Sequence, residues 1–190
     1  METPSISHIK TGKHSKRQKL TGIYMNTLIT HKITVPIIHI NKNIKDTLEK
    51  IIKEKIEGKC SVEGYIKPQS CKILTYSSGL VSGNNIIFEV VLECLVCHPV
   101  EGMNIDCIAK NITTAGIRAE INETPSPVII FIARDHHHMS KSFSNIKEGD
   151  LIRIKVIGQR FELNDKYVSL IASLVEKKNT DKKKSLIILN

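Results

Sequence analysis

The sequence predicts an α+β protein that is mainly β: a small helix-plus-antiparallel-sheet domain followed by a five-stranded barrel. Two observations predict this class. A single stretch, residues 41–58, has apolar residues at helical spacing. The rest of the chain from about residue 27 onward is a series of β-branched runs separated by Gly, Pro, Ser and Asn.

The composition fits an ordinary globular protein. With 190 residues the chain can form one medium domain or two small ones, and 41% hydrophobic with 25% charged residues is typical of that class. No apolar run is long enough to cross a bilayer, and the first twenty residues lack the apolar segment of a secretory signal. We therefore expect an intracellular protein with no membrane partner.

The net charge of +9 is concentrated at the two ends of the chain. Residues 1–20 hold five Lys or Arg and one Glu, and residues 176–190 hold five Lys, one Glu and one Asp. We read residues 1–20 as a disordered basic arm and residues 177–190 as a basic tail. Such tails attract phosphate at long range, but they can equally be plain solvated ends.

The first domain is expected over residues 21–98. Residues 27–40 predict a strand in which Pro36 marks a break or an edge position. The helix follows, with Asn41 or Asn43 as its cap and Gly58 at its left-handed stop. Its apolar face consists of Ile44, Leu48, Ile51, Ile52 and Ile56. Three further strands are predicted over residues 60–66, 70–76 and 84–97.

The second domain is expected over residues 99–176. Its five strands are predicted at residues 102–110, 115–121, 126–134, 150–158 and 166–174. In the last two strands the apolar positions alternate with polar ones: Ile152, Ile154, Val156, Val168, Leu170, Ala172 and Leu174 face inward, and Arg153, Lys155, Tyr167, Ser169 and Ser173 face outward. Five short strands with the longest break between the third and the fourth predict an OB-fold barrel.

That break contains the run "DHHH" at residues 135–138. A metal site needs ligands that converge from one side, and adjacent residues of an extended chain alternate in direction. Only His136 and His138 could then point together. Three interpretations stay open: a polar loop closing one end of the barrel, contact of one or two histidines with RNA bases, and a metal site. We predict no metal.

The five cysteines are expected to be structural thiols. Their number is odd, and disulfides are rare in a reducing compartment. Cys94 and Cys97 form a CxxC pair, but in a strand a spacing of three places the two side chains on opposite faces. A second CxxC, which a zinc site would require, is absent from the sequence.

Signatures of catalysis are also absent from the sequence. It contains neither GxxxxGK with a following Ser or Thr nor GxGxxG, which hold phosphates, and it has no GxSxG nucleophile elbow. We therefore predict no catalytic residue, no cofactor and no enzymatic activity.

The order of these segments resembles one family. "KIIKEKIEGKCSVEGYIKP" resembles the helix-then-strand segment of the RNA polymerase stalk subunit, the seventh subunit of eukaryotic polymerase II and its archaeal counterpart; its marks are Gly58, Cys60 and Gly64. "SSGLVSGNNIIFEVVLECLVCHPVEG" is similar to the family's glycine turn, long strand and Pro-x-x-Gly junction, with Pro99 and Gly102. "IKEGDLIRIKVIGQRFELNDKYVSLIASL" is similar to its OB barrel.

The resemblance covers roughly residues 27–175 and is strongest to the versions encoded by large cytoplasmic DNA viruses. The chain departs from the family at three places. Met103 and Asn104 stand where acidic residues are usual, "ETPSP" replaces a Gly-Pro pair, and "GIRAEI" lacks the aromatic residue of RNA-stacking barrels.

The resemblance implies a non-catalytic subunit of a DNA-directed RNA polymerase. Its first domain would be the tip domain that docks at the clamp of the core enzyme, and its OB domain would guide nascent RNA; a second stalk subunit is a further expected partner. The implied location is host cytoplasm and virion for a viral protein, and the nucleus for a cellular eukaryotic one. The implied docking residues are Lys55, Gly58, Lys59, Gly79 and Gly83, in the loops at 55–59 and 77–85.

RNA contact is expected at Arg118, Phe131, His136, Arg153, Lys155, Arg160 and Tyr167. The competing interpretation is that the cations are merely solvated and that Phe131 is core. The competing function is a free-standing RNA-binding OB protein in translation or RNA handling. A fused helix-plus-sheet module favours the polymerase subunit, since a free OB protein does not need one.

Overall fold

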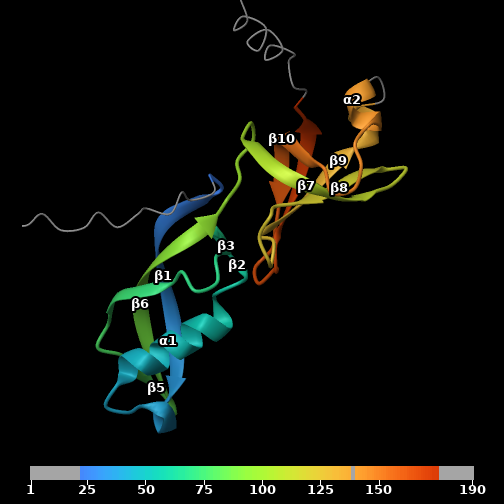
Figure 1. The fold of residues 1–190 in the computed structure, drawn as a ribbon. Coiled ribbons are helices and arrows are strands. Elements are labelled where there is room, and N and C mark those ends of the chain that lie inside the picture. The colour runs from blue at the N-terminus through green and yellow to red at the C-terminus, as the bar shows by residue number, and fades with distance from the viewer. Residues whose placement is uncertain (1–21, 138–139, 176–190) are drawn as a thin grey trace, which may run out of the picture.

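The computed structural model describes residues 22–137 and 140–175. They form two β structures in chain order, a sheet carrying one long helix and then a closed barrel (Figure 1). The predicted mainly β, α+β class is confirmed. The basic arm at 1–20 and the basic tail at 177–190 lie outside the described residues. Among the described residues no helix is long and apolar enough to cross a membrane.

The first sheet is built on two 13-residue strands, β1 (Tyr24–Pro36) and β6 (Asn85–Cys97), which pair antiparallel along their full length. The other edge of β6 pairs in turn with β5 (Leu80–Ser82), β4 (Lys72–Tyr76) and β3 (Gly64–Ile66). Strand β2 (Cys60–Ser61) then pairs with β3. Strand β1 is an edge strand and Pro36 is its last residue, so the proline withdraws no hydrogen bond from the middle of the sheet.

Three predictions in this sheet were wrong in detail. Residues 60–66 form two short strands rather than one, because the Ser61 hydroxyl bonds to the Glu63 carboxylate and folds the chain into a turn at residues 62–63. Residues 77–85 are not a plain loop, because Leu80–Ser82 pairs with β6 as β5. Residues 37–40, predicted as strand, include a 3-10 turn, η1 (Ile37–His39).

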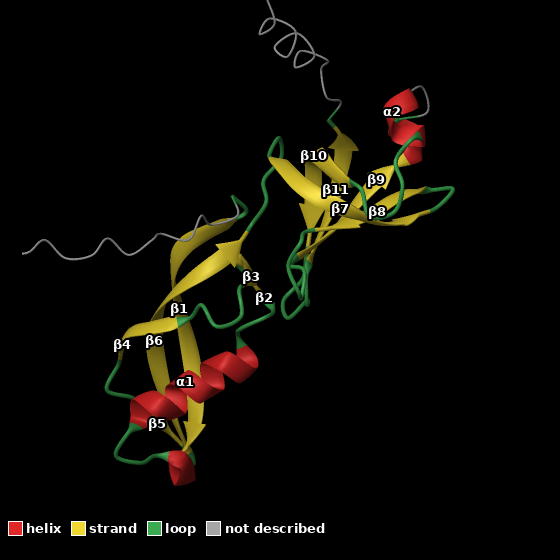
Figure 2. Ribbon diagram, in the orientation of Figure 1, coloured by secondary structure: helices red, strands yellow, loops and turns green. Residues whose placement is uncertain are grey.

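Helix α1 (Ile44–Lys55) covers one face of this sheet (Figure 2). Of the predicted apolar face, Leu48 and Ile52 are fully buried, and Ile44, Ile51 and Ile56 pack at the margin of the same core. That core also takes inward side chains of β1, β4 and β6: Ile29, Ile33, Val35, Ile73, Phe88, Val90, Leu92, Cys94 and Val96.

The helix ends differ in part from prediction. Asn43 occupies the N-cap position, but its side chain caps no backbone amide and donates to the Asp46 carboxylate instead. Gly58 has the predicted left-handed conformation, with φ +72°. Its amide donates to the carbonyl of Ile66 at 2.9 Å, so this glycine starts the return of the chain to the sheet.

The second structure is the closed five-stranded barrel, consistent with the predicted OB-fold. Its strands are β7 (Asn104–Ile112), β8 (Gly116–Glu120), β9 (Val128–Ala133), β10 (Leu151–Arg160) and β11 (Val168–Leu174). They close in the order β7-β8-β9-β11-β10, and β9 and β11 run parallel. The inward alternation of Ile152, Ile154, Val156, Val168, Leu170 and Ala172 is confirmed, since all six are buried.

The break between β9 and β10 is not a plain loop. It contains a 3-10 turn, η2 (Arg134–His136), and one turn of helix, α2 (Lys141–Ser144). The Ser140 hydroxyl accepts the amide of Phe143 at 3.3 Å and begins this short helix. Phe143 is buried against the barrel core, which closes that end of the barrel.

The sheet and the barrel are joined by contacts between residues far apart in the sequence. The backbone of Cys60 exchanges two hydrogen bonds with the β10–β11 connection, donating to Asp165 at 2.8 Å and accepting from Asn164 at 2.9 Å. The Tyr24 hydroxyl donates to Glu123 at 2.8 Å. Tyr24, Cys60, Tyr65 and Cys97 are consequently part of the barrel core, although they belong to the first sheet.

Candidate nucleic-acid interface

An exposed row of side chains crosses the outer face of three barrel strands. Arg118 of β8 lies opposite Phe131 of β9, and Phe131 lies opposite Ile171 of β11. The neighbours Ile130 and Ile132 fill the barrel interior, so the alternation of the strand forces Phe131 outward. Phe131 is 40% exposed and Ile171 is 53% exposed. We name Arg118, Phe131 and Ile171 the barrel row.

The barrel row combines a flat aromatic ring, an aliphatic neighbour and a cation. The guanidinium of Arg118 is bonded to Glu120 at 2.8 Å, with about half of the Arg118 side chain exposed. Ion pairs at such exposure contribute little and exchange readily with other anions. An exposed ring with a cation beside it is the arrangement on which bases of single-stranded nucleic acid stack.

The structure places two more predicted residues close to the row. Arg160 lies opposite Ser169, two residues from Ile171, and forms an exposed ion pair of 3.2 Å with Glu162. Tyr167 immediately precedes β11 and is 41% exposed. Phe131 and Tyr167 are therefore both surface aromatics, and the interpretation of Phe131 as core was wrong.

Arg153 and Lys155 lie in the first half of β10. Arg153 makes a two-pronged ion pair with Asp106 on β7, at 2.7 and 2.9 Å. This carboxylate raises the pKa of Arg153. The guanidinium is therefore already paired with a carboxylate of the same chain. Lys155 borders a shallow hollow of about 440 Å³ with Glu101 and Ser173. Lys155 also lies opposite Ser173 of β11, two residues from Ile171 on the side away from Arg160, whereas Arg153 pairs with Asp106 on β7.

The backbone at the histidine run is not extended, although the prediction assumed that it was. Residues 134–136 form a 3-10 turn, in which His136 is exposed, and His138 lies outside the described residues. His137, which the prediction left out, is the anchored residue: its Nδ1 lies 3.0 Å from the carbonyl of Ala133, and its Nε2 accepts the amide of Leu174 at 2.9 Å. No group of three or more potential metal ligands gathers anywhere in residues 22–137 and 140–175.

Ile171 is a surface residue that the sequence analysis missed. It lies between Leu170 and Ala172, both of which were assigned to the interior, so its outward direction could be read from the alternation. An isoleucine at an outward position of a barrel strand is the signal that could have found it.

The predicted docking residues lie at two places. One is the C-terminal end of α1, with Lys55, Gly58 and Lys59; the other is the two ends of β5, with Gly79 and Gly83. Lys59 donates to the carbonyls of Glu54 and Lys55, at 3.1 and 3.4 Å, and so caps the end of α1. Gly79 is needed for packing, since a Cβ there would lie 2.7 Å from Ile86 and 2.8 Å from Phe88. Gly83 has φ +58° with open space around it and forms the β5–β6 turn.

Apolar side chains gather around that turn, at the end of the sheet remote from the barrel (Figure 1). The amide of Ile37 bonds to the carbonyl of Asn84, which brings η1 beside the β5–β6 hairpin. The exposed side chains there are Ile37 at 47%, Ile38 at 85%, Leu80 at 70% and Val81 at 68%. We name these four residues the distal apolar group. Contiguous apolar patches on a surface mark contact sites, which makes this group a candidate for one.

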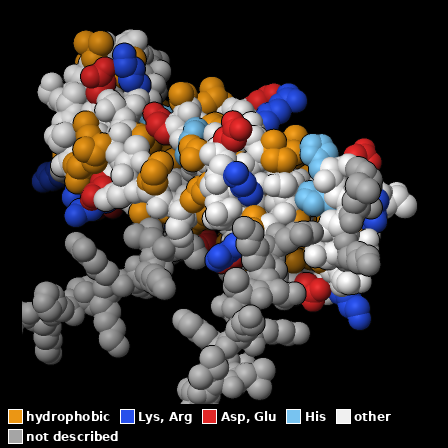
Figure 3. All heavy atoms as spheres, turned by 90° about the horizontal axis from the view of Figure 1, so that it is seen from above, with side chains coloured by type: hydrophobic (Ala, Val, Ile, Leu, Met, Phe, Trp, Pro, Cys, Tyr) orange, Lys and Arg blue, Asp and Glu red, His pale blue; other side chains and the backbone are white. Residues whose placement is uncertain are grey.

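Charge does not single out a binding face in the view of Figure 3. Lys and Arg side chains are interspersed with Asp and Glu on the coloured part of this face, and hydrophobic side chains reach the surface between them. Much of the excess charge of the sequence lies in the two ends that the structure does not describe.

The fold and its surface together define a two-part protein: a sheet with a distal apolar group, joined to an OB-type barrel with an exposed aromatic row. No known protein-family model matches the chain. A protein of Acanthamoeba polyphaga mimivirus, named as a putative DNA-directed RNA polymerase subunit, is 26% identical to this chain over an alignment of 190 residues. The alignment covers 89% of this chain and 93% of the mimivirus protein. The chain is thus a homologue of this mimivirus protein along most of its length, in agreement with the resemblance of its sequence.

Proposed function

We propose that this chain is a non-catalytic stalk subunit of a multisubunit DNA-directed RNA polymerase. The observation that carries this proposal is the extent of the mimivirus match. An alignment that covers 89% of this chain cannot be confined to the barrel, so it includes sequence of the helix-covered sheet as well. A free-standing OB protein would not require that second module. For a viral polymerase, as the mimivirus match suggests, the expected place is the host cytoplasm and the virion.

The distal apolar group is the proposed contact with the core polymerase. Its four side chains are exposed on two neighbouring segments, which is unusual for a surface that meets only water. The predicted docking residue Gly83 lies in the β5–β6 turn next to this group, whereas Lys55, Gly58 and Lys59 lie at the C-terminal end of α1. We assign the clamp contact to the distal apolar group and the turn at Gly83.

The barrel row is the proposed contact with nascent RNA. Stacking of a base on an exposed aromatic ring contributes about 1–3 kcal/mol and tolerates any sequence, as a guide for emerging transcripts requires. Arg160 and Tyr167 extend the surface next to the row. Under this proposal the chain only binds RNA, because nucleotide addition would take place in the large subunits.

Affinity purification of the tagged protein from infected cells tests the docking. We expect the two largest polymerase subunits to co-purify in near-equal amounts with the wild type and to be lost with Leu80→Asp combined with Val81→Asp. Leu163→Asp is the matched control, since Leu163 is 64% exposed in the β10–β11 connection, outside the distal apolar group. Recovery of RNA or ribosomal proteins without polymerase would instead identify a free-standing RNA-binding protein.

Binding of a labelled single-stranded RNA oligonucleotide tests the barrel row separately. Phe131→Ala should weaken binding by about 5-fold to 150-fold, the equivalent of one lost stacking contact. Leu151→Ala is the control, because Leu151 is 70% exposed on β10, outside the row. Equal binding by the wild type and both variants would remove the RNA role while leaving the polymerase contact open to its own test.

A further inference from the structure

Two cysteine side chains, Cys71 and Cys94, lie side by side in the first sheet. Their Sγ atoms are 3.1 Å apart, within the distance of a thiol–thiol hydrogen bond. Lys72 pairs with Glu93, so Cys71 stands opposite Cys94 where the chain enters β4. Both residues are free thiols. The sulfur atoms of a disulfide are about 2.05 Å apart, so the two would need to approach each other by roughly 1 Å.

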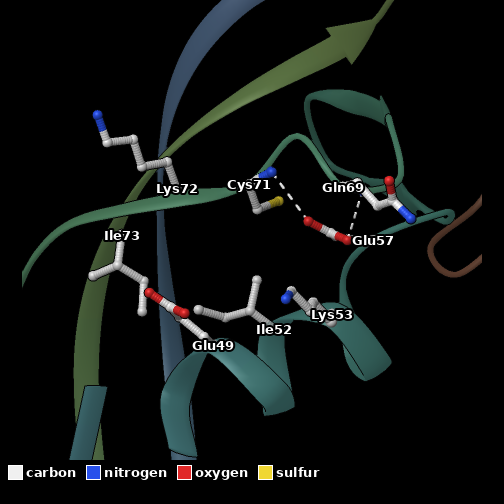
Figure 4. A pocket seen from close by; sticks show the side chains of 8 residues that line it. All are labelled: Glu49, Ile52, Lys53, Glu57, Gln69, Cys71, Lys72 and Ile73. Carbon is white, nitrogen blue, oxygen red and sulfur yellow. Dashed lines mark hydrogen bonds between the residues drawn. The ribbon is translucent and has the colours of Figure 1, made fainter. Parts of the chain in front are cut away.

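The two thiols differ in access to solvent. Cys94 is fully buried in the core beneath α1. Cys71 is half-buried and lines an open hollow of about 450 Å³ between α1 and β4, with Lys53 and Lys72 among its neighbours (Figure 4). A small reagent from solution therefore meets Cys71 first, and Cys94 lies behind it.

The backbone on either side holds Cys71 in this position. The Glu57 carboxylate accepts the amide of Cys71 at 3.0 Å and the amide of Gln69 at 2.8 Å (Figure 4). The hydroxyl of Ser70 accepts the amide of Leu95 on β6 at 3.2 Å. The segment is thus fixed both to the end of α1 and to β6, which keeps the two sulfur atoms adjacent.

The other three cysteines are placed where such chemistry is disfavoured. Cys60, Cys97 and Cys107 are buried, and burial raises the pKa of Cys60 to about 11 and those of Cys97 and Cys107 to about 12. Within the pair, the shared hydrogen bond raises the pKa of Cys71 and lowers that of Cys94, so Cys94 ionises before Cys71. Among the buried cysteines, Cys94 is therefore the one whose attacking thiolate forms most readily.

We propose that Cys71 and Cys94 form a reversible intramolecular disulfide, with a small-molecule disulfide such as oxidised glutathione as the oxidant. The Cys71 proton passes along the hydrogen bond to the Cys94 sulfur, and the Cys71 sulfur attacks one sulfur of the oxidant, which forms a mixed disulfide and releases one thiolate. The Cys94 thiolate then attacks the Cys71 sulfur, forming the internal bond and releasing the second thiolate. The two released thiolates take up the two protons, the cysteine pair loses two electrons, and the oxidant gains them.

The bond would tie β4 to β6 on the face that α1 covers, and excess glutathione would reverse both steps. This inference does not rest on the proposed function, since it uses only the geometry of the first sheet. It changes the expectation that all five cysteines are inert structural thiols by giving two of them redox chemistry.

Treatment of the purified full-length protein with oxidised glutathione tests the proposal. We expect an intact mass lower by about 2 Da, one cross-linked peptide pair containing Cys71 and Cys94, and reversal by dithiothreitol. The oxidised protein should melt higher by roughly 5–10 °C, because the bond closes a chain loop in the unfolded state. Cys71→Ser should abolish both the mass change and the shift in melting temperature.

Cys71→Ser serves as the main variant because the half-buried position tolerates a hydroxyl more readily than the buried Cys94 does. Cys107→Ala is the matched control, since it removes a buried thiol of the barrel and should leave the cross-link unchanged. A stable glutathione adduct on Cys71 with Cys94 still free would overturn the proposal. So would a cross-link to another cysteine, or no reaction at Cys71.

Discussion

The Nε2 atom of His137 accepts a 2.9 Å hydrogen bond from the backbone amide of Leu174, at the end of the last barrel strand. The other ring nitrogen lies 3.0 Å from the carbonyl of Ala133, which can only accept, so the neutral ring carries its proton on Nδ1. The ring also stacks on Phe143, with centroids 5.1 Å apart. His137 therefore fastens the β9–β10 connection to β11.

Replacement of this histidine should loosen the end of the barrel. His137→Ala leaves the Leu174 amide without its acceptor and removes the stacking on Phe143, so we expect a loss of about 1–3 kcal/mol in the free energy of unfolding. Hydrogen exchange at the Leu174 amide should become at least about tenfold faster. His136→Ala, at the exposed neighbour, should stay within about 0.5 kcal/mol of the wild type. Equal effects of the two variants would refute the structural role of His137.

The contact between Tyr24 and Glu123 should couple the two halves of the protein energetically. The hydroxyl of Tyr24 donates to Glu123, and Lys67 lies 3.4 Å from the same carboxylate and 4.4 Å from the centre of the Tyr24 ring. Burial and this carboxylate raise the pKa of Tyr24, so the hydroxyl keeps its proton. Tyr24→Phe should lower the free energy of unfolding by about 1–2 kcal/mol while preserving the ring.

A double-mutant cycle with Glu123→Gln distinguishes coupling from independent damage. We expect a coupling energy of at least about 0.5 kcal/mol from urea unfolding, since both single changes disturb the same hydrogen bond. Glu54→Gln replaces an exposed carboxylate of α1 and provides the control for lost charge. Additive effects of the Tyr24 and Glu123 changes would mean that the bond contributes nothing across the junction.

Gly64 should be the glycine that least tolerates a side chain in the first sheet. It has φ +130°, and a Cβ would lie 2.5 Å from the carbonyl oxygen of Cys97. Gly64→Ala should therefore cost at least about 2 kcal/mol, from strain and from disruption of the β3–β6 pairing. Gly102→Ala is the control: it has a similar requirement, φ +84°, but open space around it, so about 1 kcal/mol is expected. Thermal unfolding that fails to separate the two variants would contradict the close approach.

Stability should fall at alkaline pH because of the buried thiols. Their pKa values in the folded protein, about 12 for Cys97 and Cys107, lie above the ordinary value of 9.0. The unfolded chain therefore loses these protons first. The stabilisation is complete below about pH 9 and is lost as the pH rises towards 12, at about 1.4 kcal/mol per pH unit for each thiol.

Urea unfolding at about pH 8 and about pH 10.5 measures this dependence. Cys107→Ala should be less stable than the wild type at the lower pH, because it removes a buried group. It should nevertheless lose less stability between the two pH values, since one ionising thiol is gone. An unchanged difference between the two pH values would show that Cys107 does not contribute to the alkaline loss.

The sequence alone was sufficient for the features that depend on local period. Leu48 and Ile52 repeat at helical spacing, and their burial follows from the geometry of a single helix. Ile152, Ile154 and Val156 alternate with Arg153 and Lys155, so the inner and outer faces of β10 could be read directly. In both cases the property belongs to one element and needs no knowledge of its partners.

Features that depend on the pairing of distant segments could not be predicted from a local repeat. Strand β5 has only three residues in a turn-rich stretch, and its pairing with β6 is what makes it a strand. The barrel row exists because β9 and β11 pair in parallel, which places Phe131 beside Ile171. The contacts of His137 with Leu174 and of Cys71 with Cys94 likewise join residues 37 and 23 positions apart.

The sequence by itself thus determined the class of fold, the long helix, most strands and the direction of their side chains, because each of these follows from a repeat of two or 3.6 residues within one segment. Only the tertiary structure decided which exposed residues lie together, which histidine is anchored and which thiols meet. The reason is that the register between strands is set by the packing of the whole core, and a local period does not contain it.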